Sequence, residues 1–266
     1  MNTFITALKN EAYHLIKRYR LTLVVHQPFK VYQTENMRVI LSGIGKSSSY
    51  AATKFALEDR DTHHGLWVNF GVAGDHALPI GSLVSVSKVT EDDAGRSWYP
   101  CVKQNPNCYV KELRTYNDPI RQYPLNSLCD MEASGFMAAV SEAISSEHIH
   151  VLKLISDNSS SGMGNLTKIL MKQLVAENIE LINEYIKSAE QNLSIEPKNL
   201  PFSAEKILKG QHFTVTQTRQ LLELYRSFCA LCPEEAWPSI ELNNRDKPSD
   251  ILAKLRLQIT QLSPQL

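Results

Sequence analysis

Hydrophobic positions along the first 190 residues form short apolar runs that alternate with segments of helical spacing. The apolar runs, which are typical of strands, cover residues 3–7, 21–25, 31–33, 38–42, 66–70, 83–89, 127–129 and 149–155, with shorter candidates near Trp98 and Leu113. The helical spacing covers residues 8–19, 47–57, 131–144 and 166–189. Strands that alternate with helices predict an α/β fold with a largely parallel sheet covered on both faces.

Several predicted strands are followed directly by a glycine or an acid. These residues are Gly43, Gly71, Asp130 and Asp157. The carboxyl ends of parallel strands gather at one edge of such a sheet, where functional residues usually lie. We therefore expect a functional site at this edge.

The acids near this edge also have ordinary structural interpretations. Glu11 and Glu132 each fall in the first turn of a predicted helix, where a solvated carboxylate is favoured by the helix dipole. Asp157 follows an apolar strand, where it could serve as a helix N-cap or in an Asx turn. The residues alone leave both interpretations open.

The second part of the chain differs in character from the first. Residues 190–201 contain two prolines and several polar residues, which predicts a linker. It would separate an α/β domain over residues 1–190 from a helical C-terminal extension over residues 200–266. Amphipathic helices are expected in the extension at 214–231 and 248–262, and their apolar faces either pack within the protein or form a subunit interface.

Charge and hydropathy exclude several classes of protein. The 266 residues include 28 basic and 28 acidic side chains. Phosphate neutralisation needs a clustered excess of Lys and Arg, so no nucleic-acid partner is expected. The chain has no apolar run of about 18 residues and no leader-like N-terminus, so we expect no membrane span and a cytoplasmic location.

Cysteines and histidines give no metal site. Five cysteines are an odd number, which favours reduced thiols over a disulfide framework. The Cys229–Cys232 pair lacks a second pair to complete a zinc site, and His63–His64 and His148–His150 lack suitable partners. We therefore expect neither a metal nor a cofactor.

Four sequence blocks in a fixed order resemble a known family. They are residues 5–11 (ITALKNE), 41–46 (LSGIGK), 69–74 (NFGVAG), and the pair 130–133 (DMEA) with 154–157 (LISD). On these blocks residues 1–160 resemble the nucleoside phosphorylase and nucleosidase superfamily, and within it the methylthioadenosine/S-adenosylhomocysteine nucleosidase-like branch. The resemblance implies a three-layer α/β/α core with a mixed, mostly parallel sheet, and a homo-oligomer, with a dimer expected by analogy.

The resemblance also implies cleavage of the N-glycosidic bond of a purine nucleoside, with or without a modified 5′ position. Asp157 would protonate the leaving base, and Glu11 would position and deprotonate the attacking water. Glu132 would accept hydrogen bonds from the ribose hydroxyls, with Met131 beside the sugar. The remaining implied substrate-binding residues are Gly43, Gly71, Val72, Ala73, Gly74 and Ser156.

Departures from the family pattern bear on the choice of nucleophile and on base recognition. Asn69 stands where the related phosphorylases carry an arginine, so water is favoured over phosphate as the nucleophile. Val72 replaces a common hydroxyl residue, and Lys153 replaces a common arginine. The segment between Tyr99 and Asp130 is shorter than in the nucleosidases and has no match to their base-stacking region. A phosphorylase and a non-catalytic nucleoside-binding protein therefore remain as alternatives.

Overall fold

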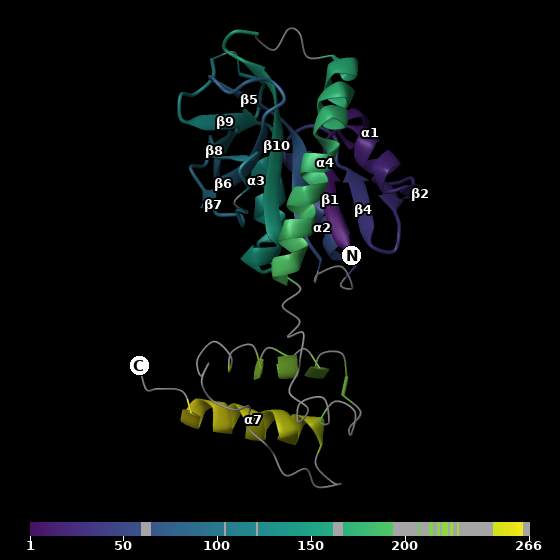
Figure 1. Cartoon of the computed structure of the whole chain (residues 1–266), viewed down its shortest axis with the longest axis vertical. Helices are drawn as coiled ribbons and strands as arrows, with labels where there is room; N and C mark the ends of the chain where they lie inside the picture. Colours follow the sequence, from purple (N-terminus) through teal and green to yellow (C-terminus); the bar gives the residue numbers. More distant parts are fainter. Residues whose placement is uncertain are drawn as a thin grey trace. The chain divides into compact units, whose positions relative to one another are not determined.

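Figure 1 shows the computed structural model of the chain. The chain divides into two compact units, Met1–Leu193 and Ser194–Leu266. The structure describes residues 1–59, 65–103, 105–120, 122–161, 167–193 and 247–262, together with scattered positions between Ile207 and Phe228. The pairs His63–His64 and Cys229–Cys232 lie outside the described residues.

Strands and helices alternate through the first unit. Its strands are β1 (Asn2–Thr6), β2 (Thr22–Val25), β3 (Lys30–Gln33), β4 (Met37–Leu41), β5 (Trp67–Asp75), β6 (Leu83–Glu91), β7 (Ser97–Trp98), β8 (Tyr109–Thr115), β9 (Ser127–Asp130) and β10 (Ile149–Asn158). Its helices are α1 (Lys9–Arg18), α2 (Lys46–Leu57), α3 (Ala133–Val140) and α4 (Lys168–Leu193), with a 3₁₀ turn at Ser146–His148. The second unit contains α7 (Pro248–Leu262).

The sheet is mixed, with parallel pairing at its centre. Strands β4, β1, β5 and β10 run parallel to one another, and the β2–β3 hairpin adds antiparallel strands at one edge. Beyond β10 come β6, β8 and β9, and β9 returns to pair with Gly74 near the end of β5. The strands β5, β10, β6, β8 and β9 therefore close into a ring, which brings the ends of β5, β9 and β10 together.

Successive residues of the central strands enter two separate cores. Phe4 of β1 and Val39 of β4 belong to the core that α1 and α4 cover. Their neighbours Ile5 and Ile40 belong to the core that α2 and α3 cover. Burial on both sides is typical of parallel strands between two helical layers. The expected three-layer α/β/α core with a mixed, mostly parallel sheet is confirmed (Figure 1).

Two strands extend further than their apolar runs predict. Strand β5 continues through Gly71 to Asp75, and β10 continues through Asp157 to Asn158. The extended parts pair with each other, with Asp157 opposite Gly74, so both backbones stay extended beyond the apolar segment. The expectation that the strand ends before Gly71 is therefore wrong.

The second unit has a small apolar core. Its buried side chains are Ile207, Leu221, Phe228, Ile251, Leu252, Leu255 and Ile259. Helix α7 contributes the last four, which lie along one face of the helix. The apolar faces of the extension thus pack together within this unit. No helix in the described parts of the chain is both long and apolar enough to cross a membrane.

A buried hydrogen-bonded group connects α4 to the sheet. The Tyr185 hydroxyl of α4 lies 2.7 Å from Ser85 Oγ of β6 and 3.0 Å from His150 Nδ1 of β10. The His150 side chain is inaccessible to solvent, and its Nε2 has no hydrogen-bond partner. Burial disfavours the charged imidazolium and lowers the pKa of His150 to about 4.

We expect His150 to make the fold sensitive to acid. In the unfolded chain the His150 ring becomes protonated as the pH falls below about 6.5. In the folded chain the same ring becomes protonated only near pH 4. The free energy of unfolding should therefore fall by up to about 1.4 kcal/mol per pH unit across this window. Urea unfolding at neutral and acidic pH would show a smaller loss in His150→Leu than in the wild type. A His148→Asn control should behave as the wild type does, and equal losses in His150→Leu and the wild type would contradict the assignment.

Candidate active site

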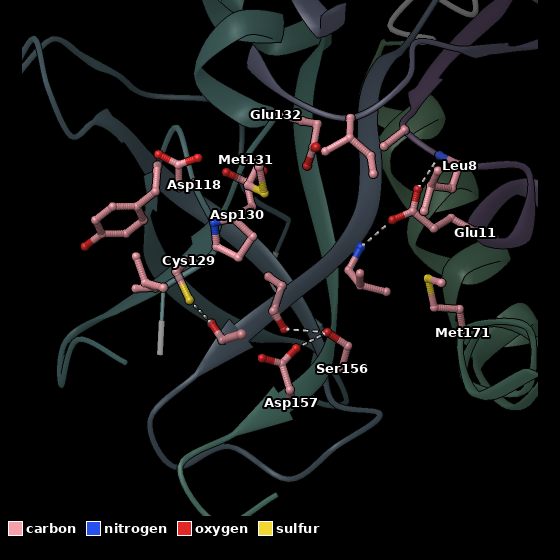
Figure 2. A pocket seen from close by; sticks show the side chains of 18 of the residues that line it. Leu8, Glu11, Asp118, Cys129, Asp130, Met131, Glu132, Ser156, Asp157 and Met171 are labelled. Atoms are coloured by element: carbon pink, nitrogen blue, oxygen red, sulfur yellow. Dashed lines mark hydrogen bonds between the residues drawn. The ribbon is translucent and has the colours of Figure 1, made fainter. Parts of the chain in front are cut away.

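A cavity of about 250 Å³ lies where the strand ends meet (Figure 2). Its wall comes from residues 7–8 and 11 after β1, 44 after β4, 72–74 in β5, 116, 118–120 and 123 after β8, 129–132 around the end of β9, 156–157 in β10 and 171 in α4. Apart from Gly43 and Gly71, every residue that the sequence implies for the site lines this cavity. The close-up shows Leu8, Glu11 and Met171 together on one side, across from Asp118 and Cys129.

Gly43 and Gly71 lie outside the cavity wall but affect the position of residues that line it. A side chain at Gly71 would begin 3.2 Å from Glu11 Oε1, so the bare backbone makes room for this carboxyl group. Gly43 has a φ of 84° and Gly45 a φ of 97°, in the left-handed region that favours glycine. This turn allows Gly45 N–H to donate to Glu132 Oε1 at 2.8 Å.

Glu11 is a buried acid at the start of α1. Its Oε2 accepts a hydrogen bond from Leu8 N–H at 2.8 Å, as in a capping box, and its Oε1 accepts one from Val72 N–H at 3.3 Å. Only 4% of the residue is exposed, so the alternative of a solvated helix-start carboxylate is wrong. Burial raises the pKa of Glu11, and the Leu8 hydrogen bond and the Lys153 charge offset part of this rise.

Glu132 follows β9 and precedes α3. Burial and, next, the negative charge of Asp130 raise the pKa of Glu132 to about 7, while Lys153 and the Gly45 hydrogen bond act in the opposite direction. The carboxyl group therefore exchanges its proton near neutral pH. A group in this state can accept hydrogen bonds from sugar hydroxyls when it is ionised.

Lys153 places a positive charge among these acids. Its Nζ lies 2.8 Å from Asp130 Oδ2, and both side chains are almost fully inaccessible. Asp130 also accepts hydrogen bonds from Thr115 Oγ1 at 2.7 Å and from Ala133 N–H at 2.9 Å, so its charge is well satisfied. Asp130 thereby joins the end of β8, the start of α3 and strand β10 around one ion pair.

Asp157 is the acid of β10. The register of β10 against β5 shifts between Ile155 and Asp157, and this bulge at Ser156 lets both Ser156 and Asp157 line the cavity. Ser156 Oγ donates to Asp157 Oδ1, and the Tyr123 hydroxyl donates to Asp157 Oδ2. The alternative of an N-cap or Asx-turn role is wrong, because Asp157 lies within a strand.

The connection between β8 and β9 supplies a wall that the sequence patterns do not predict. Tyr116, Asp118, Pro119, Ile120 and Tyr123 line the cavity from this short segment. In the sequence this segment shows two tyrosines, Tyr116 and Tyr123, without a helical or strand-like pattern between them. The region without a base-stacking match therefore does form part of the cavity.

Among the residues that the structure describes, no group of three or more His, Cys, Asp or Glu side chains could hold a metal ion. Cys101, Cys108 and Cys129 are free thiols. None of the described residues that line the cavity is an arginine. The polar side chains of the cavity wall are the carboxyl groups, the hydroxyl groups of Ser156, Tyr116 and Tyr123, and the thiol of Cys129.

No protein-family model matches the chain, and no curated protein matches it in sequence. Among solved structures, the chain is similar to a 5′-methylthioadenosine/S-adenosylhomocysteine nucleosidase from Neisseria meningitidis in complex with methylthio-immucillin-A. This match has a TM-score of 0.58 and 16% identity, and it covers 70% of this chain and 98% of that chain.

Nucleosidases of the same kind from Helicobacter pylori and Chlamydia trachomatis are also similar. The TM-scores are 0.55 and 0.52, the identities 12% and 21%, and the matches cover 72% and 69% of this chain and 97% and 98% of those chains. The resemblance to this branch is thus confirmed at the level of the fold. The chain has the fold of the 5′-methylthioadenosine/S-adenosylhomocysteine nucleosidases.

We expect the Lys153–Asp130 pair to stabilise the site strongly. Lys153→Met would leave the charge of Asp130 buried without its partner, so the free energy of unfolding at neutral pH should fall by about 3–5 kcal/mol. Lys153→Met combined with Asp130→Asn should recover part of this loss. Urea unfolding measures the free energy of unfolding of the single and of the double variant. Lys54→Met, which breaks an exposed ion pair with Glu142, serves as the control and should change stability little. A double variant as unstable as the sum of its single variants would contradict the pairing.

Proposed function

We propose that the first unit hydrolyses the N-glycosidic bond of a purine nucleoside. The observation that carries this proposal is the meeting of Glu11, Glu132 and Asp157, from three separate segments, around one small cavity. Cleavage of this bond builds positive charge on the ribose and negative charge on the base. A site for it needs an acid near the base and anionic groups near the sugar and the water.

Asp157 is the proposed general acid. As the bond breaks, its electron pair moves to the base, and the Asp157 proton transfers to a ring nitrogen of the base. The carboxylate that remains accepts hydrogen bonds from Ser156 and Tyr123. Those donors stabilise the charge that forms on Asp157 during the step.

Glu11 is the proposed base for the attacking water. Its buried position raises its pKa, which strengthens the carboxylate as a proton acceptor. The Leu8 and Val72 N–H groups fix the orientation of its two oxygens. A water held by Glu11 would attack the ribose carbon as the base departs.

Glu132 and Met131 are the proposed ribose-binding residues. Glu132 Oε1 already accepts the Gly45 hydrogen bond, and its other oxygen remains for the sugar hydroxyls. Leu8, Ile44 and Met171 add apolar surface to the wall. That surface suits an uncharged substituent on the ribose 5′ carbon.

Water is the proposed nucleophile rather than phosphate. Asn69 is buried in β5 and donates to Ile5 O at 3.4 Å, so it lies in the sheet without offering a positive charge to the cavity. A phosphate dianion would enter a site that already gathers carboxyl groups, and it would lack the arginine fork that matches it best.

Incubation of the purified chain with a panel of purine nucleosides, with and without phosphate, tests this proposal. We expect release of free base at the same rate in both conditions. Asp157→Asn should reduce the rate by at least about 100-fold while nucleoside binding persists, because only the proton donor is lost. If release of free base requires phosphate, the protein is a phosphorylase. If nucleosides bind but no base is released, the protein is a non-catalytic nucleoside-binding protein.

We also expect ribose binding to depend on pH through Glu132. Its pKa of about 7 means that the carboxylate is mostly protonated at lower pH, when it accepts hydroxyl hydrogens poorly. KM should therefore rise about tenfold from pH 8 to pH 6 as the ionised fraction falls. In Glu132→Gln, KM should be high and should not vary with pH. A wild-type KM that stays constant across this range would contradict the role of Glu132.

A further inference from the structure

Tyr123 is a residue of the cavity wall that contacts the proposed acid, Asp157, from a different segment of the chain. Its hydroxyl donates to Asp157 Oδ2, and Ser156 Oγ donates to the other oxygen of the same carboxylate. Tyr123 belongs to the short β8–β9 connection, where the sequence has no match to a base-binding region. Its contact with Asp157 therefore comes from a part of the chain that departs from the family pattern.

The absence of a side chain at Gly74 leaves space for the Tyr123 ring. A side chain at Gly74 would overlap the Tyr123 ring and would begin 2.9 Å from Cys129 Sγ and 3.0 Å from Asp157 Oδ2. Only the bare backbone of β5 allows the ring and the carboxylate to lie together at this point. The contact thus depends on a glycine near the end of the long strand β5.

The hydroxyl keeps its proton under all ordinary conditions. Burial and the neighbouring Asp157 carboxylate both raise the pKa of Tyr123 far above its usual value. The phenol is therefore a neutral hydrogen-bond donor toward Asp157.

We propose that Tyr123 is a positioning residue that orients the Asp157 carboxyl group and stabilises the carboxylate formed when its proton passes to the leaving base. This inference rests on the proposed nucleosidase function. A carboxylate offers about four lone-pair sites, so the bonds from Tyr123 and Ser156 leave sites free for the transferred proton. Tyr123 itself gives up no proton: the one proton moves from Asp157 to the base, and the bond electrons move with the base.

The role predicts a separation of kcat from KM in Tyr123→Phe. In this variant the phenyl ring still fits against Gly74, and only the hydrogen bond from the hydroxyl to Asp157 is lost. A hydrogen bond to a charged group is worth about 10- to 100-fold in rate when the charge forms in the transition state, so kcat for a purine nucleoside should fall by this factor. KM should change little. Tyr109→Phe, on the half-exposed Tyr109 of β8 outside the cavity wall, is the matched control and should keep the wild-type kcat.

A substrate that needs no acid separates this role from a structural one. 4-Nitrophenyl β-D-ribofuranoside releases nitrophenolate, which leaves without protonation. Its rate of cleavage should be equal in Tyr123→Phe and the wild type, although the purine rate falls. An equal loss on both substrates would show that Tyr123 only supports the structure of the site.

The outcomes distinguish this inference from the function on which it rests. Unchanged purine turnover in Tyr123→Phe, or equal losses on both substrates, overturns the role of Tyr123 and leaves the nucleosidase function standing. A wild-type chain that releases no base from any nucleoside overturns both. Loss on the purine substrate alone supports the role of Tyr123 as the partner of Asp157.

Discussion

The buried ion pair between Lys153 and Asp130 is the interaction on which the arrangement of the site depends. Four of the carboxyl groups that line the cavity are largely buried, those of Glu11, Asp130, Glu132 and Asp157, and like charges in a buried site repel strongly. Lys153 pairs directly with Asp130, and its charge also offsets the rise in the pKa values of Glu11 and Glu132. Burial still raises the pKa of both acids above the ordinary value, and that of Glu132 to about 7, so Glu132 can exchange a proton near neutral pH.

Close packing around this charge depends on glycines that lie within a strand. Gly71 leaves room for Glu11, and Gly74 leaves room for Tyr123 and Asp157. Two glycines three residues apart on β5 thus admit side chains from α1, β10 and the β8–β9 connection. In the sequence they resemble a turn, because glycine commonly ends strands. In the fold they keep the strand extended while functional groups pack against it.

The sequence predicts what depends on local pattern and not what depends on long-range pairing. Apolar runs identify the central strands because those strands are buried on both faces, and the family resemblance brings Glu11, Glu132 and Asp157 to one cavity. The ring of strands is not predictable in the same way, since it arises from pairing of β9 with Gly74. The place of Tyr123 depends on that ring. Its polar surroundings in the sequence give no periodic signal, so its contact with Asp157 appears only in three dimensions.

Charge balance also limits which nucleophile the site can accept. In the proposed hydrolysis, a neutral water would bind at Glu11, and the proton that the water loses would reduce the negative charge of that residue. Phosphorolysis would add a dianion near Glu11 and Glu132, and Lys153 is already committed to Asp130. A single ammonium cannot balance both the resident acids and an incoming dianion without leaving one of them unpaired. In the proposed function, the same buried lysine that pairs with Asp130 would therefore favour water over phosphate as the nucleophile.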